Sequence, residues 1–303
     1  MDRVYGFHGD PPLNVWERCS MQSFADHGHE MVLFSYDRLE VPQGVRLESA
    51  ADIISTEERD KFFALALGLY SQFSDFFRYE LLRQHGGWWI DTDVLCKSPT
   101  LPSQPVVVGE TRPGKLCGAI MRFPSGHPVL GEACDYCRSH LDILADSHRT
   151  VIGPILMSDL FKEHPIVVSD IELFYPIRGK DVWKLGEPES AGAVQGAIAS
   201  SPMVHWFQEF FRAAGLPRDL LPPAGSFLAD AFMSHGGAHE RHISLAEYRA
   251  HAPRRNKKEH GARKSKKEHA PRKEGLLRSL WSWARGGAAL MKRAGQSMPQ
   301  KMD

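Results

Sequence analysis

Three features typical of secreted and membrane proteins are missing from this sequence. No run of 18 apolar residues occurs in the 303 residues, so we expect no transmembrane helix. Met1, Asp2 and Arg3 lead directly into an apolar segment, without the hydrophobic region of a signal peptide. Five cysteines, an odd number without the spacing of a disulfide scaffold, predict free thiols. We therefore expect a cytoplasmic protein.

The formal net charge of zero conceals two oppositely charged parts. Residues 249–303 contain 16 Lys and Arg against 4 Asp and Glu, a net charge of +12, and residues 1–248 carry −12. Residues 249–274 are basic and repetitive, with no side chain that could build a core, which predicts a disordered linker. We expect a folded domain at 1–248 and a disordered tail at 296–303.

Between linker and tail, residues 275–295 have the pattern of a basic amphipathic helix. Leucine and tryptophan fill one half of its helical wheel, and arginine, lysine and serine fill the other. This pattern is typical of a helix that lies on an anionic membrane surface, although docking on a protein remains open. Nucleic acid is not an expected partner, because residues 1–248 are acidic and the tail lacks a recognisable nucleic-acid module.

Strand and helix signals alternate over residues 1–248, which predicts an α/β fold with a mixed, mostly parallel sheet flanked by helices. Residues 60–85 are expected to form a central helix that is buried on nearly all sides. The other expected strands are residues 4–7, 31–36, 106–109, 119–123 and one within 165–176, and the other expected helices are 14–27, 131–144 and 202–214, the last with a strand end before it.

Two carboxylates, Asp91 and Asp93, follow the short apolar run of residues 88–90. Alternate side chains of a strand share a face, so we expect both carboxylates to leave the sheet edge in the same direction. Hard oxygen ligands of this kind suit Mg²⁺ or Mn²⁺, which keep coordination positions open for substrate phosphates. The pair alone is a weak signal, so a divalent-cation site and a solvated strand end both remain open at this point.

The residues around this pair resemble the sugar-binding region of glycosyltransferase family 32. The matching positions, in order and spacing, are Ser74, Asp75, Arg78, Leu82, Gly86, Gly87, Trp89, Asp91 and Asp93. Weaker similarities extend over roughly residues 3–235: the first strand and its loop, a loop at 150–154, the aromatic strand 174–176, and the segment around His205. Two departures, Cys117-Gly118 and Trp206-Phe207-Gln208, fall where relatives line the sugar or acceptor pocket.

The resemblance implies that residues 1–248 are a catalytic domain with a GT-A-type nucleotide-sugar-binding fold. Transfer would depend on Mn²⁺ or Mg²⁺ and would retain the anomeric configuration, with the leaving phosphate accepting the proton of the acceptor. The donor would be a UDP- or GDP-sugar, and the acceptor a surface glycan or glycolipid at the inner face of the membrane. A toxin-like protein glycosyltransferase and a catalytically inactive nucleotide-sugar-binding scaffold remain alternatives.

The resemblance also implies roles for individual residues. Asp93 would bind the metal, with Asp91 acting through water, ribose or sugar. His205 is the candidate third ligand, with a purely structural histidine as the alternative. Asp75 and Arg78 would bind the donor sugar and diphosphate, although an ion pair within one helix remains the alternative. The remaining expected substrate-binding residues are Phe7 near the base, Gly86 and Gly87 at the turn, Trp89 near the donor, and Gly153 and Pro154 in the loop.

Overall fold

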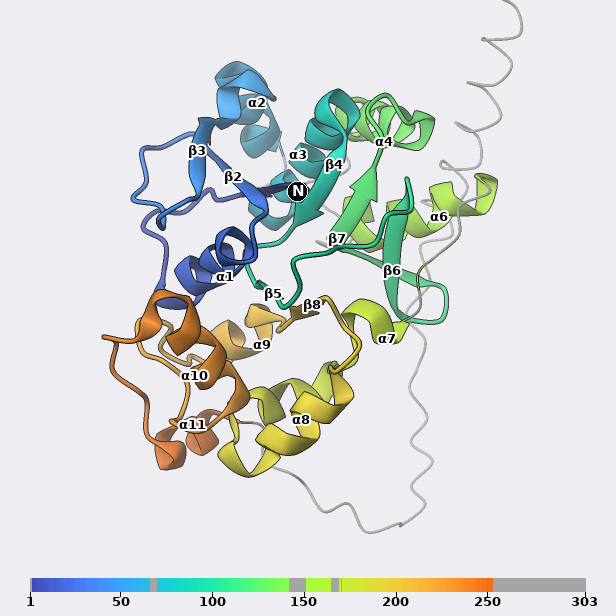
Figure 1. Cartoon of the computed structure of the whole chain (residues 1–303). Helices are drawn as coiled ribbons and strands as arrows, with labels where there is room; N and C mark the ends of the chain where they lie inside the picture. The colour runs from blue at the N-terminus through green and yellow to red at the C-terminus, as the bar shows by residue number, and fades with distance from the viewer. Residues whose placement is uncertain (1, 66–69, 142–150, 165–168, 170, 253–303) are drawn as a thin grey trace, which may run out of the picture. The chain divides into compact units, whose positions relative to one another are not determined.

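A six-stranded sheet lies at the centre of the computed structural model, which describes residues 2–65, 70–141, 151–164, 169 and 171–252 (Figure 1). The strand order is β3-β2-β1-β4-β7-β6, and only β7 runs against the other five strands. The predicted mixed, mostly parallel sheet is therefore confirmed. The strands are β1 Arg3–Phe7, β2 Glu30–Ser35, β3 Arg46–Ser49, β4 Gly87–Ile90, β6 Val107–Arg112 and β7 Lys115–Phe123.

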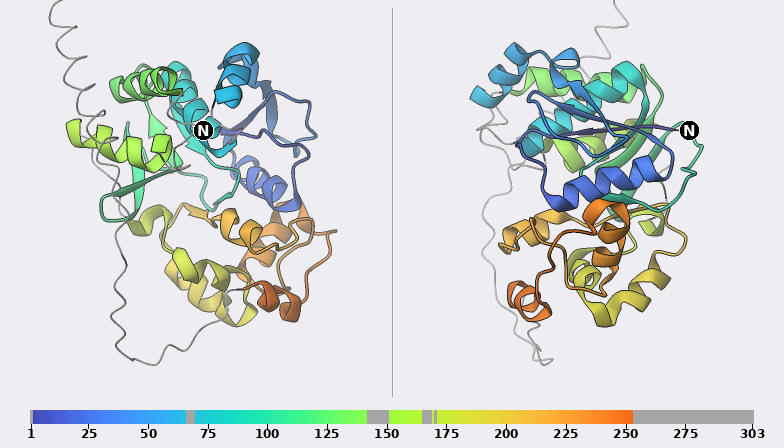
Figure 2. Two further views of the ribbon diagram at one scale, coloured as in Figure 1. Left: turned by 180° about the vertical axis from the view of Figure 1, so that it is seen from behind. Right: turned by 60° about the vertical axis from the view of Figure 1, so that its left-hand side comes forward.

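Helices cover both faces of this sheet (Figure 2). The helix α1, Val15–Asp26, packs on one face, and α3, Tyr70–His85, packs on the other against β1, β4 and β7. Asn14 starts α1 by a capping box, in which its side chain accepts from the Glu17 amide while Glu17 accepts from the Asn14 amide. The other helices are α2 Thr56–Leu65, α4 Pro128–Ser139, α6 Leu156–Glu163, α7 Ile171–Phe174, α8 Ala191–Ala197, α9 Gln208–Ala213, α10 Phe227–Phe232 and α11 Leu245–His251.

Successive side chains of the central strands point to opposite faces of the sheet, so the apolar residues of these strands form a core on each face. Val4, Trp88 and Ile90 belong to the apolar cluster on the side of α1. Phe7 and Trp89 point to the other side, where both rings approach Phe77 of α3. Consequently α3, which carries Asp75 and Arg78, is fixed against the strand that leads to Asp91.

A second, two-stranded sheet pairs β5, Val94–Cys96, with β8, Met203–His205. The pairing is antiparallel, with Val94 opposite His205. Below it a separate apolar cluster joins α1 to the late helices, and its largest buried side chains include Trp16, Trp206 and Tyr248. This cluster holds β8, and hence His205, beside the turn after β4.

Three expectations differ from the structure. The helix expected at 60–85 appears as two helices, α2 and α3, with residues outside the described ranges between them. The expected burial on nearly all sides is wrong for α2, where Leu65 is exposed. The strand expected at 174–176 is also wrong, because α7 ends there and the Tyr175 amide donates to the Ile171 carbonyl, 2.9 Å away. Asp91 and Asp93 lie in a turn, since β4 ends at Ile90.

Part of the expected organisation lies outside the described residues, including Thr150, nearly all of the linker, the amphipathic helix and the tail. The described chain continues past Tyr248 to the end of α11 at His251. Within the described ranges no helix is long and apolar enough to cross a membrane.

Gly86 and Gly114 provide a matched test of the turn that leads into β4. Both have a left-handed backbone, with φ of 63° and 74°, but a methyl group on Gly86 would lie 2.5 Å from the Ser125 amide nitrogen, whereas one on Gly114 would meet nothing within 4 Å. We expect Gly114→Ala to lower the free energy of unfolding by about 1–2 kcal/mol, the cost of the left-handed conformation. Gly86→Ala should lower it by at least ~2 kcal/mol more, because backbone atoms must move. Urea titration of both variants measures the difference, and equal losses would contradict the packing of this turn.

Candidate metal and substrate site

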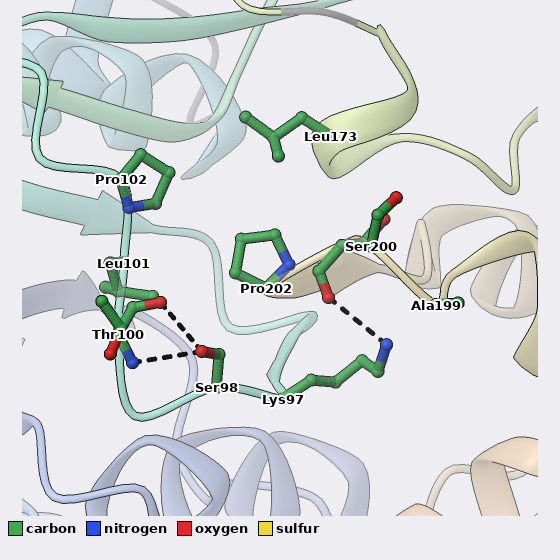
Figure 3. Close-up of a pocket in the computed structure, with 10 residues that line it drawn as sticks. Lys97, Ser98, Thr100, Leu101, Pro102, Leu173, Ala199, Ser200 and Pro202 are labelled. Carbon is green, nitrogen blue, oxygen red and sulfur yellow. Dashed lines mark hydrogen bonds between the residues drawn. The ribbon is translucent and has the colours of Figure 1, made fainter.

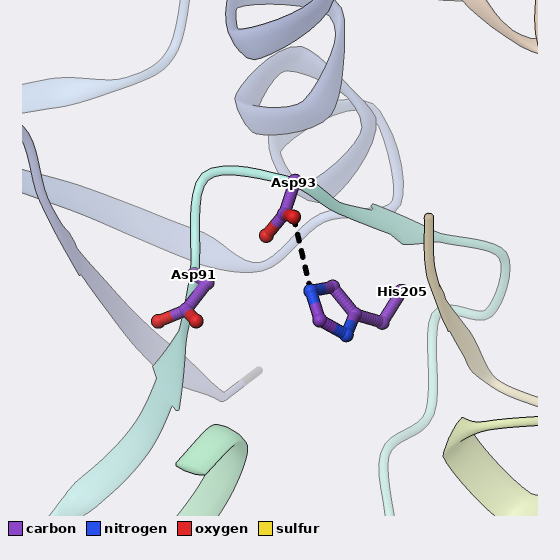
Figure 4. A group of neighbouring side chains, drawn as sticks. All are labelled: Asp91, Asp93 and His205. Atoms are coloured by element: carbon purple, nitrogen blue, oxygen red, sulfur yellow. Dashed lines mark ion pairs between the residues drawn. The ribbon is translucent and has the colours of Figure 1, made fainter. Parts of the chain in front are cut away.

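Three side chains that could bind a metal converge where β4 ends (Figure 4). Asp91, Asp93 and His205 each offer one ligand atom, and these atoms lie within 4.8 Å of one another. The Asp91 amide still donates to the Ala119 carbonyl of β7 at 2.8 Å, after which the chain turns into β5. Pairing of β5 with β8 then brings His205 beside Asp93. The turn after β4 therefore brings the two carboxylates together, in place of the single strand face that was expected. The second sheet adds His205.

Asp93 and His205 form a buried ion pair. Nε2 of His205 lies 3.0 Å from Oδ2 of Asp93, which also accepts from the Gln208 amide at 2.8 Å. Burial opposes both charges, but the attraction between the groups outweighs it: the pKa of His205 is raised to about 10 and the pKa of Asp93 is lowered. At neutral pH the pair therefore consists of a protonated His205 beside an ionised Asp93.

Asp91 is held from its other side by Arg78. Nη2 of Arg78 lies 3.1 Å from Oδ1 of Asp91, and the indole Nε1 of Trp89 donates to the same oxygen at 2.9 Å. The Asp91 side chain remains 30% exposed. One oxygen of Asp91 is thus fixed by two donors, while the carboxylate still reaches the surface.

The guanidinium of Arg78 is buried between α3 and the sheet. It also pairs with Asp75 at 3.3 Å, donates through Nη2 to the Ser74 hydroxyl at 3.3 Å, and lies 5.0 Å above the Trp89 ring. A methyl group on Gly118 would lie 2.5 Å from Nη1 of Arg78. Glycine at position 118 therefore leaves room for the guanidinium, a requirement that the sequence did not reveal.

Asp75 faces the loop formed by residues 151–155. A methyl group on Gly153 would lie 2.4 Å from Oδ2 of Asp75, so only glycine allows this approach. The Tyr79 hydroxyl donates to the Ile152 carbonyl at 2.7 Å, and the Pro154 carbonyl accepts from Ser158 at 2.6 Å. Burial raises the pKa of Asp75 to about 7, more than the nearby Arg78 lowers it. Gly153 thus lies directly beside Asp75, and Pro154 follows it in the same loop.

The structure places the other expected substrate-binding residues differently. Gly86 precedes β4 and Gly87 begins it, so four residues of strand rise, about 13 Å, separate Gly87 from Asp91. A methyl group on either glycine would meet other parts of the chain. Trp89 is fully buried beneath Arg78, and Phe7 is buried among Tyr36, Phe73 and Phe77. These side chains support the site from within the core, and their contact with substrate stays a prediction.

Two residues next to His205, which the sequence marked only as a departure from relatives, contact the site in ways that the sequence did not predict. Phe207 has a left-handed backbone with φ of 52°, the only positive φ among the described non-glycine residues, and its ring lies 4.0 Å from that of His205. Gln208 donates its amide to Asp93. No local pattern predicts a left-handed phenylalanine.

The residues Asp91, Asp93 and His205 fit a divalent cation. They offer two carboxylates and an imidazole, the ligand types that Mn²⁺ accepts. Nε2 of His205 lies 3.0 Å from the Asp93 carboxylate, and the three candidate ligand atoms are within 4.8 Å of one another, close enough for one ion to contact all three. A cation here would replace the proton that His205 now shares with Asp93.

A pocket of about 470 Å³ lies at the other end of the two-stranded sheet (Figure 3). Lys97, which follows β5, and Pro202, which precedes β8, both line this pocket. The other lining residues are Ser98, Thr100, Leu101, Pro102, Leu173, Ala199, Ser200 and Ser201. The Lys97 ammonium is engaged by the carbonyls of Ile198 and Ser201. None of the predicted site residues lines this pocket.

Comparison with known proteins identifies a family similarity within the first half of the chain. Residues 57–106 match the model of a family described as capsular polysaccharide synthesis proteins. This sixth of the chain includes Asp75, Arg78, Asp91 and Asp93. A search of curated proteins finds no match.

Similar solved structures include two glycosyltransferases. One is the PaToxG glycosyltransferase, 12% identical with a TM-score of 0.43, covering 78% of this chain and 85% of that chain. Another is the apo-form glycosyltransferase GlyE of Streptococcus pneumoniae TIGR4, 12% identical with a TM-score of 0.41, covering 68% of this chain and 54% of that chain.

The buried Asp75 carboxyl predicts a pH-dependent stability. Its folded pKa of about 7 lies above the ordinary value of 3.8, so its contribution is fully present below pH 3.8 and is lost as the pH rises through 7. We expect Asp75→Asn, which stays neutral, to lose less stability than wild type between pH 4 and pH 8, by a few kcal/mol. Denaturant titrations across this range, without metal, measure the difference. Parallel curves for the two proteins would mean that Asp75 is ionised throughout.

Proposed function

We propose that the chain is a metal-dependent glycosyltransferase that moves a sugar from a UDP- or GDP-sugar to a glycan or glycolipid acceptor. The observation that carries this proposal is the convergence of Asp91, Asp93 and His205 beside the buried Arg78. The match of residues 57–106 to capsular polysaccharide synthesis proteins supports a role in building a surface polysaccharide.

The charges of the site favour binding a cation and a diphosphate together. Asp91 and Asp93 supply two negative charges, which Arg78 and protonated His205 balance. A divalent cation that displaces one proton adds one net positive charge, and a diphosphate would offset it. The bound cation would act as a Lewis acid that stabilises the departing diphosphate.

The residues of the chain then have separate tasks. Asp93 and Asp91 would hold the cation, with His205 as third ligand, and Arg78 would orient Asp91 through their ion pair. Asp75, kept neutral by burial at low pH, can donate or accept a hydrogen bond to a sugar hydroxyl. These roles place the sugar between α3 and the turn after β4.

Retention of anomeric configuration is the stereochemical outcome we infer. Each of the three carboxylates is already engaged: Asp75 and Asp91 by Arg78, and Asp93 by His205. A carboxylate restrained in this way is a poor nucleophile, which favours attack on the same face with the leaving phosphate accepting the proton. No separate general base is then required.

Asp93→Asn tests the metal site. We expect hydrolysis of the UDP- or GDP-sugar in saturating Mn²⁺, without acceptor, to fall about tenfold or more, because the variant loses a charged ligand. Asp135→Asn changes an exposed aspartate on α4 in the same way and serves as the matched control. Nucleotide release measured by chromatography gives both rates.

More than a tenth of wild-type hydrolysis in Asp93→Asn, with Asp135→Asn also active, would rule out Asp93 as an essential ligand. Absence of hydrolysis in wild type with every nucleotide sugar tested would count against the proposed function itself.

The basic C-terminal segment motivates a proposal on location, a peripheral protein at the inner face of the membrane. Residues 249–303 carry a net charge of +12, and each basic residue near an anionic surface contributes about 1 kcal/mol of salt-sensitive attraction. We expect the full chain to float with vesicles containing phosphatidylglycerol at low salt, and a chain ending at residue 252 to remain unbound. Equal flotation of both chains would contradict an anchor in this segment.

A further inference from the structure

Glu17 of α1 is a buried carboxylate that none of the proposed metal or substrate contacts uses. Only 4% of the residue is exposed, so each of its oxygens needs a hydrogen-bond partner. Oε2 accepts from the Asn14 amide at 3.0 Å, a contact of the capping box that begins the helix. Oε1 accepts from the side-chain amide of Gln208 at 3.2 Å, 191 positions later in the chain. One oxygen therefore serves α1 itself, whereas the other binds the first residue of α9.

The side-chain amide of Gln208 is held at both of its ends. Its nitrogen donates to Glu17, and its oxygen accepts from Nη1 of Arg218 at 2.9 Å. Nη1 of Arg218 also lies 3.8 Å from Oε1 of Glu17, so the three side chains contact one another. A carboxylate can accept only from the nitrogen end of an amide, and a guanidinium can donate only to the oxygen end. These two charged partners therefore define one orientation of the Gln208 side chain.

The main chain of the same glutamine holds Asp93, the expected metal ligand. The Gln208 amide donates to Oδ2 of Asp93 at 2.8 Å, and this oxygen also lies 3.0 Å from Nε2 of His205. Phe207, just before Gln208, has a left-handed backbone with φ of 52°, which is unfavourable for a residue with a side chain. Backbone preference alone would therefore not keep the Gln208 amide pointing at Asp93. The bonds of the Gln208 side chain supply a second anchor for this turn.

We propose that Glu17 is a positioning residue of the cation site, which acts on Asp93 through Gln208. This inference rests on the proposed function and adds a residue outside the ligand set that raises the affinity for the metal. Glu17 and Arg218 hold the Gln208 side chain, and the Gln208 amide then keeps Oδ2 of Asp93 in place. Hydrogen-bond partners that orient metal ligands typically contribute about 10–100-fold to metal affinity.

The helix that carries Glu17 is a firm support for this role. Trp16, the preceding residue, is fully buried, and its indole nitrogen donates to the Leu220 carbonyl at 2.7 Å. The Trp16 ring also packs against Phe211 of α9, with centroids 5.2 Å apart. Apolar packing therefore already joins α1 to α9, and the bond between Glu17 and Gln208 adds direction to that contact. Loss of this bond should loosen the Gln208 amide while the fold remains intact.

Titration of the full chain with Mn²⁺ in the presence of UDP or GDP tests the positioning role, with free Mn²⁺ measured by electron paramagnetic resonance. We expect Gln208→Met, which keeps the main-chain amide and the side-chain length, to weaken Mn²⁺ binding about tenfold. Glu17→Gln should weaken it similarly, because one amide oxygen replaces two carboxylate oxygens. Gln22→Met is the matched control: Gln22 also lies on α1 and bonds a carboxylate, that of Asp26, at 2.7 Å. This control should bind Mn²⁺ as wild type does.

The melting temperature of each metal-free protein separates positioning from a purely structural role. Weaker Mn²⁺ binding by folded Gln208→Met and by folded Glu17→Gln, with Gln22→Met unchanged, supports the positioning role. A lower melting temperature of Gln208→Met with unchanged Mn²⁺ affinity would overturn it and leave the cation site standing. Weaker binding in Glu17→Gln alone would also overturn it, because the effect would then come from the charge of Glu17. A wild-type chain that binds no Mn²⁺ would overturn the cation site of the proposed function, and the positioning role with it.

Discussion

The burial of one guanidinium group, that of Arg78, constrains the arrangement of the site. A charged group removed from water must be paired and hydrogen-bonded, because a buried charge without partners costs several kcal/mol. Arg78 meets this requirement with Asp91, Asp75 and Ser74, and by stacking over Trp89. These partners come from α3 and from β4 with the turn that follows it, so the ion pairs fix the helix in register with the strand.

The same constraint explains two glycines far apart in the sequence. Gly118 on β7 leaves the space that the guanidinium occupies, and Gly153 leaves the space that the Asp75 carboxylate occupies. Neither glycine has a positive φ, and a methyl group at either position would lie within 3 Å of these side chains, so close approach is a reason for glycine at both. A side chain at either position would displace Arg78 or Asp75, and through Arg78 would disturb Asp91.

The sequence revealed local features better than long-range ones. Asp75 and Arg78 were expected on one helix face because a spacing of three is a property of the helix itself, and β4 was expected because Gly86 and Gly87 precede an apolar run. The strand expected at 174–176 failed, since the aromatic run Phe174-Tyr175 reflects packing against Trp88 and His205 at the end of a short helix. The approach of Gly153 to Asp75 and the left-handed Phe207 depend on segments brought together only by folding, and no sequence period reports them.

The central claim is that a divalent cation binds Asp91, Asp93 and His205. Pulsed electron paramagnetic resonance of Mn²⁺ with the full chain and a nucleoside diphosphate addresses it directly, because a bound imidazole nitrogen modulates the electron spin echo. The account predicts one bound Mn²⁺ per chain with a nitrogen modulation that disappears in His205→Phe. Mn²⁺ that stays free in solution, or a modulation unchanged in that variant, would contradict the account.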